Sequence, residues 1–270
     1  MNWNPTWICP ANDLGDPAAV FGTSFVFEKK ITLANLTITA MGVYEARLNG
    51  RRVGQFVMAP GWTSYHKRLQ YQEYDITDLL TNGKNEIEVT VGKGWYRSPL
   101  PGWLGCAYQD ELRSRPCGLA AQITLTFEDG SSKILSTDES WKVSDGPVRF
   151  SEIYDGEIYD SAKTPLLDQP VTIFDGPTDT LILQQGEEVC EQERLAVKKV
   201  FVTPNGETVL DFGQNMTGYV ELFVNAKAGD CVDLSFAEVM DKEGNFYTEN
   251  YRGAKAQYHY ICSDGVQTWH

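Results

Sequence analysis

The sequence predicts an all-β protein built from two antiparallel β-sandwiches of jelly-roll-like form. Three observations support this prediction: short runs of alternating apolar and polar residues recur along the chain, Asn-Gly and Asp-Gly turns separate several of them, and helical periodicity is scarce. Short strands at regular spacing, with turn residues between them, are typical of β-sandwiches. With 42% apolar and 12% aromatic residues, the 270-residue chain can fill one large core or two ordinary ones.

The first predicted strands show clear alternation. In residues 29–42, "KKITLANLTITAMG", the side chains expected to face inward are those of Ile31, Leu33, Leu36, Ile38 and Ala40. Residues 43–58 predict a hairpin around Asn49-Gly50, because a type I′ turn needs positive φ at both central positions. "NEIEVTVG" (85–92) predicts a further strand, with the side chains of one face being Ile87, Val89 and Val91.

Further elements follow the same pattern. One short helical turn is predicted in residues 74–85, capped by Asp75 or Thr77, with Leu79 and Leu80 buried and Asn82-Gly83 as its stop. Residues 120–144 predict two strands around Asp129-Gly130 and a third near Trp141. In the last third, strands are predicted in residues 207–213, 218–226, 230–239 and 257–262, with turns at Gly206, Gly229 and Gly244.

A domain boundary is predicted where prolines interrupt the strand pattern. Residues 161–179 hold three prolines, which suit extended connecting chain better than a central strand. We therefore expect a first sandwich in residues 1–165, and a connector plus a second sandwich in residues 166–270.

Charge and cysteine usage limit the partners and the compartment. The formal net charge of −14 argues against binding to nucleic acid or to anionic membranes, which requires clustered Lys and Arg. The N-terminus shows no signal-peptide pattern, and no run approaches the roughly 18 apolar residues of a membrane span. The six cysteines are spread without a CxxC pair, as expected for free thiols in a reducing compartment. The prediction is a cytoplasmic protein without nucleic-acid or membrane partners.

Paired carboxylates are the remaining candidate for catalysis. The three histidines stand in no nucleophile-elbow or metal-ligand spacing, which argues against Ser-His-Asp chemistry and a histidine metal site. "DGEIYD" (155–160) instead offers Asp155, Glu157 and Asp160, and glycoside hydrolysis needs two carboxyl groups about 5 to 9.5 Å apart. Residues three apart in an extended strand face opposite sides, so the alternative is that these carboxylates cap turns.

An aromatic stretch is the second candidate site. "GKGWYRSPLPGWLG" (92–105) places Trp95, Tyr96 and Trp103 in a Gly- and Pro-rich loop after a strand. Aromatic rings in such loops can stack on the apolar C–H faces of sugars, or close the end of a sandwich core. We expect Trp95 to close the core and Trp103 to be the open ring. The acidic residues also leave a calcium site possible, although no EF-hand loop is present.

The order of several motifs resembles that of the bacterial α-L-rhamnosidases of glycoside hydrolase family 78. These motifs are "GVYEARLNGRRVG", "APGWTSYHKRLQYQEYDITDLL", "GKGWY", "YDGEIYDSAK", "LDFGQNMTGYVELFV" and "FAEVMDKEGNFYTENYRGAKAQYHYICSDG". The resemblance covers residues 24–269 and implies the two non-catalytic β-sandwich regions that precede the family's (α/α)₆ barrel. That barrel, which carries the catalytic acid and base, has no counterpart in this sequence.

The resemblance therefore implies a fragment without catalytic residues of its own, truncated before the barrel, with the second sandwich incomplete at its C-terminus. Its expected partners are the catalytic barrel of the parent enzyme and glycosides or polysaccharides with terminal L-rhamnose. Two alternatives stay open: a stand-alone carbohydrate-binding module with calcium-assisted rhamnose binding, and a small hydrolase that uses Glu157 and Asp160. The residues expected to contact sugar are Trp95, Tyr96, Trp103, Asp155, Glu157 and Asp160.

Overall fold

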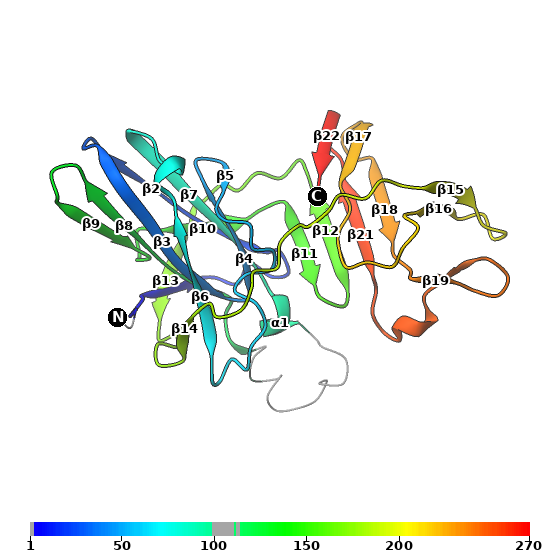
Figure 1. Ribbon diagram of the computed structural model, residues 1–270, viewed down its shortest axis with the longest axis horizontal. Helices are drawn as coiled ribbons and strands as arrows, with labels where there is room; N and C mark the ends of the chain where they lie inside the picture. The colour runs from blue at the N-terminus through cyan, green and yellow to red at the C-terminus, as the bar shows by residue number, and fades with distance from the viewer. Residues whose placement is uncertain (1–2, 99–110, 112–113) are drawn as a thin grey trace.

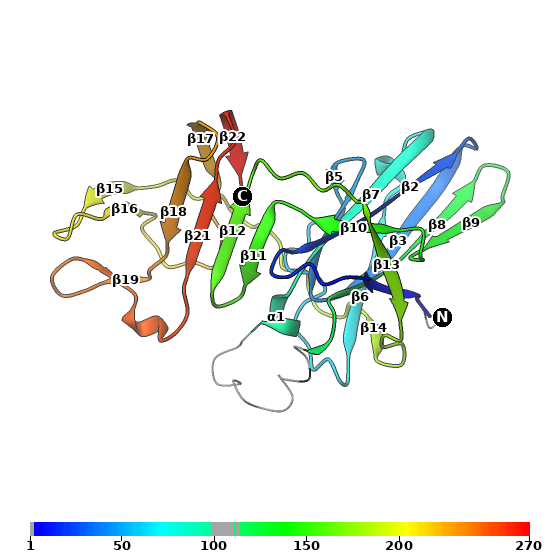
Figure 2. The same ribbon diagram turned by 180° about the vertical axis from the view of Figure 1, so that it is seen from behind.

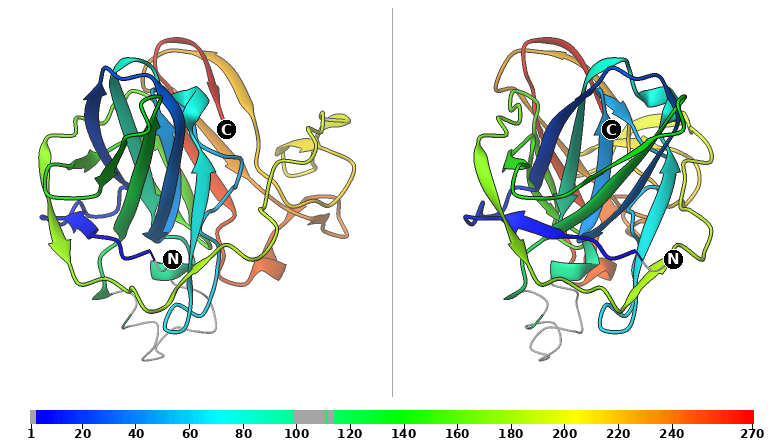
Figure 3. Two further views of the ribbon diagram at one scale, coloured as in Figure 1. Left: turned by 60° about the vertical axis from the view of Figure 1, so that its left-hand side comes forward. Right: turned by 90° about the vertical axis from the view of Figure 1, so that its left-hand side faces the viewer.

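The computed structural model describes residues 3–98, 111 and 114–270 and places twelve strands of that part of the chain in one large sheet. This sheet folds into two facing layers that form the first sandwich (Figures 1 and 3). The order along the sheet is β14-β6-β3-β8-β1-β13-β10-β2-β7-β4-β5, with β9 beside β8. Its strands are β1 (Trp7–Pro10), β2 (Ala19–Phe27), β3 (Ile31–Met41), β4 (Val43–Leu48), β5 (Arg51–Arg52), β6 (Leu69–Asp75), β7 (Gly83–Gly92), β8 (Gly118–Phe127), β9 (Ser132–Ser136), β10 (Lys142–Asp145), β13 (Gln169–Phe174) and β14 (Leu181–Leu183).

The second unit is built around a four-stranded sheet in the order β11-β12-β21-β18. Its strands are β11 (Val148–Glu152), β12 (Gly156–Asp160), β18 (Cys231–Ser235) and β21 (Gln257–Ile261). Three two-stranded sheets accompany it: β15 (Lys199–Val202) with β16 (Thr208–Asp211), β17 (Leu222–Ala226) with β22 (Gly265–Trp269), and β19 (Val239–Met240) with β20 (Phe246–Tyr247). The named helical elements are short: α1 (Gly94–Arg97), η1 (Thr77–Leu79) and η2 (Glu249–Tyr251). The all-β prediction is confirmed.

Strand pairing crosses the predicted boundary at residue 165 in both directions. β11 and β12 precede this residue, yet β12 pairs in parallel with β21 of the second unit. β13 and β14 follow it, yet they pair with β1, β10 and β6 of the first sandwich. Figure 2 shows β11 and β12 beside β21, with β13 lying across the first sandwich. The connection between the two units is therefore made of strands, and not of a single linker.

Alternating apolar side chains of β7 and β3 fill the core of the first sandwich. Ile87, Val89 and Val91 are each no more than 1% exposed, as the sequence predicts. In β3 the prediction for Leu33 is wrong, because this side chain is 42% exposed. A register shift between Ile31 and Leu33, opposite β8, inserts one residue and reverses the alternation, so that Ala34 faces the core instead.

The predicted turns are present and tie the strands together. Asn49 (φ 52°) and Gly50 (φ 76°) form the tight connection between β4 and β5. The Asn49 amide donates to the carbonyl oxygen of Leu79 at 2.9 Å, which joins the hairpin to η1. Asp75 accepts hydrogen bonds from the amide N–H and the hydroxyl of Thr77, and these bonds lower its pKa. Leu79 and Leu80 are half-buried against the core.

The second unit is held by an aromatic core. Tyr159 of β12 stacks on Tyr260 of β21, with ring centroids 5.5 Å apart and planes 13° apart. Trp269 contacts Tyr159, Tyr258 and Tyr260, and only 6% of its surface is exposed. Large aromatic side chains bury much area per residue, so these four rings replace the larger aliphatic core of the first sandwich. No helix in the described ranges is long and apolar enough to cross a membrane.

Removing the central ring of this core should destabilise the protein. We expect Trp269→Ala to lower the free energy of unfolding by about 3–5 kcal/mol, the usual cost of emptying a buried aromatic site. Phe223→Ala on the paired strand β17 is the control, because Phe223 is 70% exposed and its loss should cost less than about 0.5 kcal/mol. Denaturant unfolding of both variants measures this difference, and equal losses would contradict the assignment of the core.

Candidate functional site

The "DGEIYD" stretch contains β12, which lies between β11 and β21 in the four-stranded sheet. Gly156 has a φ of 85°, and a Cβ atom at this position would lie 2.0 Å from the carbonyl oxygen of Gln257. Only glycine therefore allows β12 to begin this close to β21. Along the strand, Glu157 shares one face with Tyr159, while Ile158 and Asp160 point to the other. Glu157 and Asp160 consequently lie on opposite faces of the sheet.

Asp160 serves the turn that follows β12. Its carboxylate accepts a hydrogen bond from the amide N–H of Ala162 at 3.0 Å, and its carbonyl accepts one from Lys163 at 3.1 Å. A carboxylate that accepts a bond two residues ahead is a typical turn cap. The geometry at Asp160 matches the turn-capping alternative considered from the sequence.

Glu157 has a different environment. It shares its face with Tyr159 and is paired in register with Tyr258, both members of the aromatic core. Burial raises the pKa of the Glu157 carboxyl to about 7, and the described residues supply no hydrogen bond or ion pair to it. A buried carboxyl without a partner favours its neutral form. Glu157 is therefore a proton-binding group near neutral pH, and Asp160 lies on the opposite face.

Residues of β12, β18 and β21 line an open groove of about 540 Å³. His259 of β21 lies directly opposite Asp233 of β18, and Nδ1 of the imidazole is 2.6 Å from the carboxylate. Polar side chains with an apolar floor can bind the hydroxyls and the C–H faces of a sugar. The lining residues are Phe150, Asp155, Glu157, Ile158, Asp233, Leu234, Ser235, Lys255, Gln257, Tyr258 and His259.

The predicted aromatic site separates into one buried and one half-buried ring. α1 begins at Gly94, whose φ is 52° and where a Cβ atom would lie 2.5 Å from Cγ1 of Val43. Tyr96 is only 2% exposed, and burial raises its pKa to about 12. Trp95 is half-buried at the edge of the same cluster and stacks on Trp62. Trp103 lies outside the described residues.

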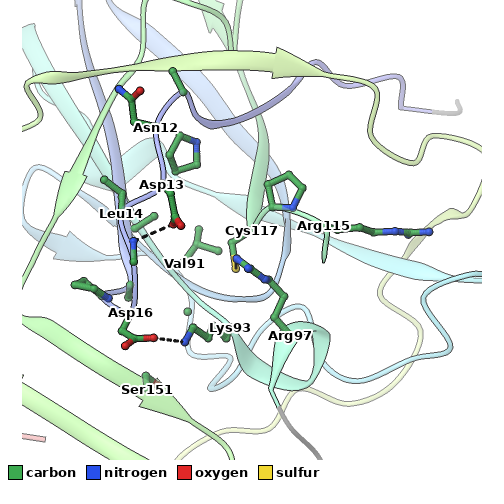
Figure 4. A pocket seen from close by; sticks show the side chains of 18 of the residues that line it. Asn12, Asp13, Leu14, Asp16, Val91, Lys93, Arg97, Arg115, Cys117 and Ser151 are labelled. Carbon is green, nitrogen blue, oxygen red and sulfur yellow. Dashed lines mark hydrogen bonds and ion pairs between the residues drawn. The ribbon is translucent and has the colours of Figure 1, made fainter. Parts of the chain in front are cut away.

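A cavity of about 290 Å³ lies between the loop after β1, the end of β7 and α1 (Figure 4). Figure 4 shows Lys93 turned toward Asp16, with an ammonium–carboxylate distance of 3.0 Å. The same ammonium lies 3.0 Å from Glu152 of β11 and 5.5 Å from the ring centre of Phe150. Burial raises the pKa of the Cys117 thiol, which lies 3.8 Å from Nη1 of Arg97. Asp16 and Glu152 already neutralise the charge of Lys93. These two ion pairs join the first sandwich to the second unit, and they leave the ammonium less suited to binding a further ion.

The described residues bring together no group of three His, Cys, Asp or Glu side chains that could hold a metal ion. Asp155, the acidic residue at the start of the "DGEIYD" stretch, lines the groove without an ion pair among the described side chains. A calcium site remains a prediction of the sequence.

Comparisons with known proteins identify the family. Residues 29–193 match the model of the α-L-rhamnosidase N-terminal domain, and residues 201–270 match that of the bacterial α-L-rhamnosidase concanavalin-like domain. The chain belongs to the bacterial α-L-rhamnosidase family. This finding confirms the resemblance on which the sequence-based assignment depends.

Similar proteins extend well beyond the length of this rhamnosidase-family chain. It is 37% identical over 253 residues to an α-L-rhamnosidase of Streptomyces avermitilis, a match covering 89% of this chain and 24% of the relative. A relative from Formosa agariphila is 35% identical over 259 residues, covering 90% of this chain and 27% of the relative. The chain therefore spans about a quarter of the length of these two relatives.

Two solved structures share the fold. The native α-L-rhamnosidase of Aspergillus terreus superposes with a TM-score of 0.91 at 36% identity, covering 98% of this chain and 32% of that one. The Streptomyces avermitilis α-L-rhamnosidase complexed with L-rhamnose superposes with a TM-score of 0.86 at 34% identity, covering 94% and 26%. The similarity includes both the first sandwich and the second unit, because it extends over nearly the whole chain.

Sequence reasoning did not single out several groups that the fold places in prominent positions. The Asp233–His259 pair depends on the register of β18 and β21, and the Lys93–Glu152 pair joins the residue between β7 and α1 to the end of β11. Neither has a local signature. Trp62 had a signal in "APGWTSYHKR", where a tryptophan stands in a polar loop, but its partner Trp95 could not be inferred from spacing.

The burial of Glu157 predicts a dependence of stability on pH. The folded state keeps the proton up to about pH 7, whereas an unfolded glutamate releases it near 4.5. The folded state thus binds more protons in this window, so stability falls as pH rises from about 4.5 to 7. Glu157→Gln removes the titration and should raise the free energy of unfolding by about 1–3 kcal/mol at about pH 8, with little effect at about pH 5.

Urea unfolding at the two pH values tests this expectation. Glu73→Gln is the matched control, because Glu73 is an exposed carboxyl on strand β6 and its replacement should change stability little at either pH. An equal effect of Glu157→Gln at both pH values would show that the side chain does not titrate in this window.

The ion pair between the units gives a second prediction. The side chain of Glu152 is 7% exposed, so Lys93→Ala would leave a buried carboxylate without its cation. We expect a loss of about 2–4 kcal/mol in the free energy of unfolding, part of which Glu152→Gln should restore in the double variant. Lys84→Ala, which breaks an exposed pair with Glu86, should cost less than about 1 kcal/mol. A loss at Lys93 no larger than that at Lys84 would contradict this role.

Proposed function

We propose that this chain is the non-catalytic N-terminal part of an enzyme that releases terminal L-rhamnose from glycosides or polysaccharides by inversion. The observation that carries the proposal is the match of both units to non-barrel domains of α-L-rhamnosidases, over residues 29–193 and 201–270. In this role the chain supplies a scaffold on which a catalytic barrel is positioned.

The carboxylate geometry supports a non-catalytic role. An inverting or retaining glycosidase needs an acid and a second carboxylate that face one sugar from its two sides. Glu157 and Asp160 point to opposite faces of β12, and Asp160 is engaged in a turn. The small-hydrolase alternative would need both groups in one cleft, so the geometry favours the scaffold.

Exposed apolar side chains on the second unit support contact with a further domain. Phe223 and Val266 lie on the same outer face of the β17–β22 pair and are 70% and 82% exposed. Val200 and Val202 of β15 are 61% and 65% exposed. Exposed apolar side chains on paired strands, such as Phe223 and Val266, are typical of surfaces that another domain covers. We propose that the catalytic barrel of the parent enzyme is the partner of this face.

Sugar binding is the second candidate function, and the groove on β12, β18 and β21 favours it. Asp155 lines this groove together with the Asp233–His259 pair, which provides acceptors and donors for sugar hydroxyls, whereas the Glu157 side chain shares the face of Tyr258. The Streptomyces avermitilis relative is described in complex with L-rhamnose, so rhamnosides are the sugars to examine first. In this reading the chain would act as a carbohydrate-binding module, with or without calcium.

Activity measurements on the chain test the scaffold role. We expect no release of chromophore from a chromogenic α-L-rhamnoside by the 270-residue chain, under conditions in which the full Streptomyces avermitilis relative is active. The physical reason is that Glu157 and Asp160, the candidate carboxylate pair, point to opposite faces of β12. Hydrolysis that disappears in Glu157→Gln would overturn the proposal and establish the small-hydrolase alternative.

A further inference from the structure

The segment that joins β14 to β15 is exposed and contains no helix or strand. This β14–β15 connector comprises residues 184–198, and all of its residues except Gln184, Cys190 and Leu195 are exposed. Figure 1 shows the connector as one extended path from the first sandwich to the second unit. Exposed polar segments without regular structure are preferred sites of proteolytic cleavage, because a protease must reach the backbone.

The backbone of the connector is anchored on both sides of a segment without backbone pairing. The carbonyl of Val189 accepts a hydrogen bond from the amide N–H of Val57 at 2.7 Å. The amide N–H of Lys198 donates to the carbonyl of Asp211 at 2.8 Å. Between these anchors, residues 190–197 make no backbone–backbone hydrogen bond to the described part of the chain. A protease can therefore bind this segment without first breaking secondary structure.

Arg194 is the one basic residue between the two anchors. Its side chain is 74% exposed, and its Nη1 donates to both carboxylate oxygens of Glu221, at 3.0 and 2.9 Å. An exposed ion pair contributes little to stability, so the guanidinium can exchange this carboxylate for another at low cost. Serine proteases that cleave after basic residues offer such a carboxylate in their specificity pocket.

Other exposed basic residues lie in turns that are closed by hydrogen bonds. The amide N–H of Lys67 donates to the carbonyl of Ser64 at 2.7 Å. Arg252 has a φ of 59°, and its amide N–H donates to the carbonyl of Glu249 at 3.3 Å. A protease reaches the peptide bonds of such turns only after they open locally. The connector is therefore the better substrate.

A cut after Arg194 would give two fragments that share one sheet. β12 belongs to the first fragment, residues 1–194, and pairs in parallel with β21 of the second, residues 195–270. Tyr159 of the first fragment also contacts Trp269 in the aromatic core of the second unit. Backbone pairing and a buried aromatic core would thus hold the fragments together without the covalent connection.

We propose that the peptide bond between Arg194 and Leu195 is a cleavage site for endopeptidases specific for basic residues, and that the cleaved protein persists as a two-chain complex. Water adds across this bond, which leaves a carboxylate on Arg194 and an ammonium group on Leu195. The strands on both sides of the β12–β21 pair lie outside the cut and keep their partners. The inference uses no part of the proposed function.

Limited digestion of the 270-residue chain with trypsin, followed by mass spectrometry, tests the site. We expect a cut after Arg194 at least about tenfold faster than after Lys67 or Arg252, because those turns must first open. Arg194→Gln should remove this cut, whereas Arg194→Lys should keep it, since trypsin accepts lysine. Arg252→Gln is the matched control and should be cut after Arg194 as fast as the unaltered chain.

Size-exclusion chromatography of the digest tests the complex. The two fragments should elute together at the volume of the intact chain in native buffer, and apart in urea. After cleavage, Tyr159→Ala should separate at a lower urea concentration than the unaltered protein, whereas Phe223→Ala, which alters an exposed ring, should not.

Contrary results are distinct for the two parts of the inference. A chain that is cut after Lys67 or Arg252 before Arg194, or that is not cut after Arg194, would overturn the cleavage site. Fragments that elute apart in native buffer would overturn the two-chain complex.

Discussion

The parallel pairing of β12 with β21 is the constraint on which the rest of the structure depends. It requires the chain to leave the first sandwich after β10, contribute two strands to the second unit, and then return as β13 and β14. Gly156 permits the approach, because any side chain there would collide with the backbone of Gln257. Tyr159 then brings its ring onto Tyr260 and Trp269, so that one strand supplies both backbone hydrogen bonds and a quarter of the aromatic core. Neither unit has a complete set of contacts without this exchange.

The exchange also explains why a charged cluster lies between the units. β11 enters the second sheet beside the end of β7, and this brings Glu152 next to Lys93 in a partly buried position. A buried carboxylate is costly unless a cation accompanies it, and Lys93 meets this need while also contacting Asp16 and the ring of Phe150. The ion pair is thus a consequence of the strand exchange and fixes its geometry. A scaffold that positions a second domain requires such fixed geometry between its parts.

Local features of the fold were predictable from the sequence, whereas features that depend on distant partners were not. Strand positions follow from two-residue alternation, and the Asn49-Gly50 turn follows from the backbone conformation that a type I′ turn demands. Leu33 was misplaced because a bulge depends on how β3 meets β8, which alternation within β3 does not encode. The same reason applies to the predicted domain boundary at residue 165. The prolines around it are visible in the sequence, but β12 pairs with β21, which lies about 100 residues further along the chain.

The candidate sites also divide into features that are set locally and features that depend on distant strands. The protonation of their carboxyl groups depends on burial and not on spacing in the sequence. Asp160 has a role that its own turn defines, so its function as a cap was open to sequence reasoning. The pKa of Glu157, only three residues away, is raised by burial, and its neighbour Tyr258 comes from another strand. Trp95 and Trp62 present the converse case. Each alone resembles an ordinary core or loop residue, and their parallel contact joins positions 33 residues apart, which no local pattern encodes. A conspicuous acidic motif is therefore weak evidence of a hydrolytic site.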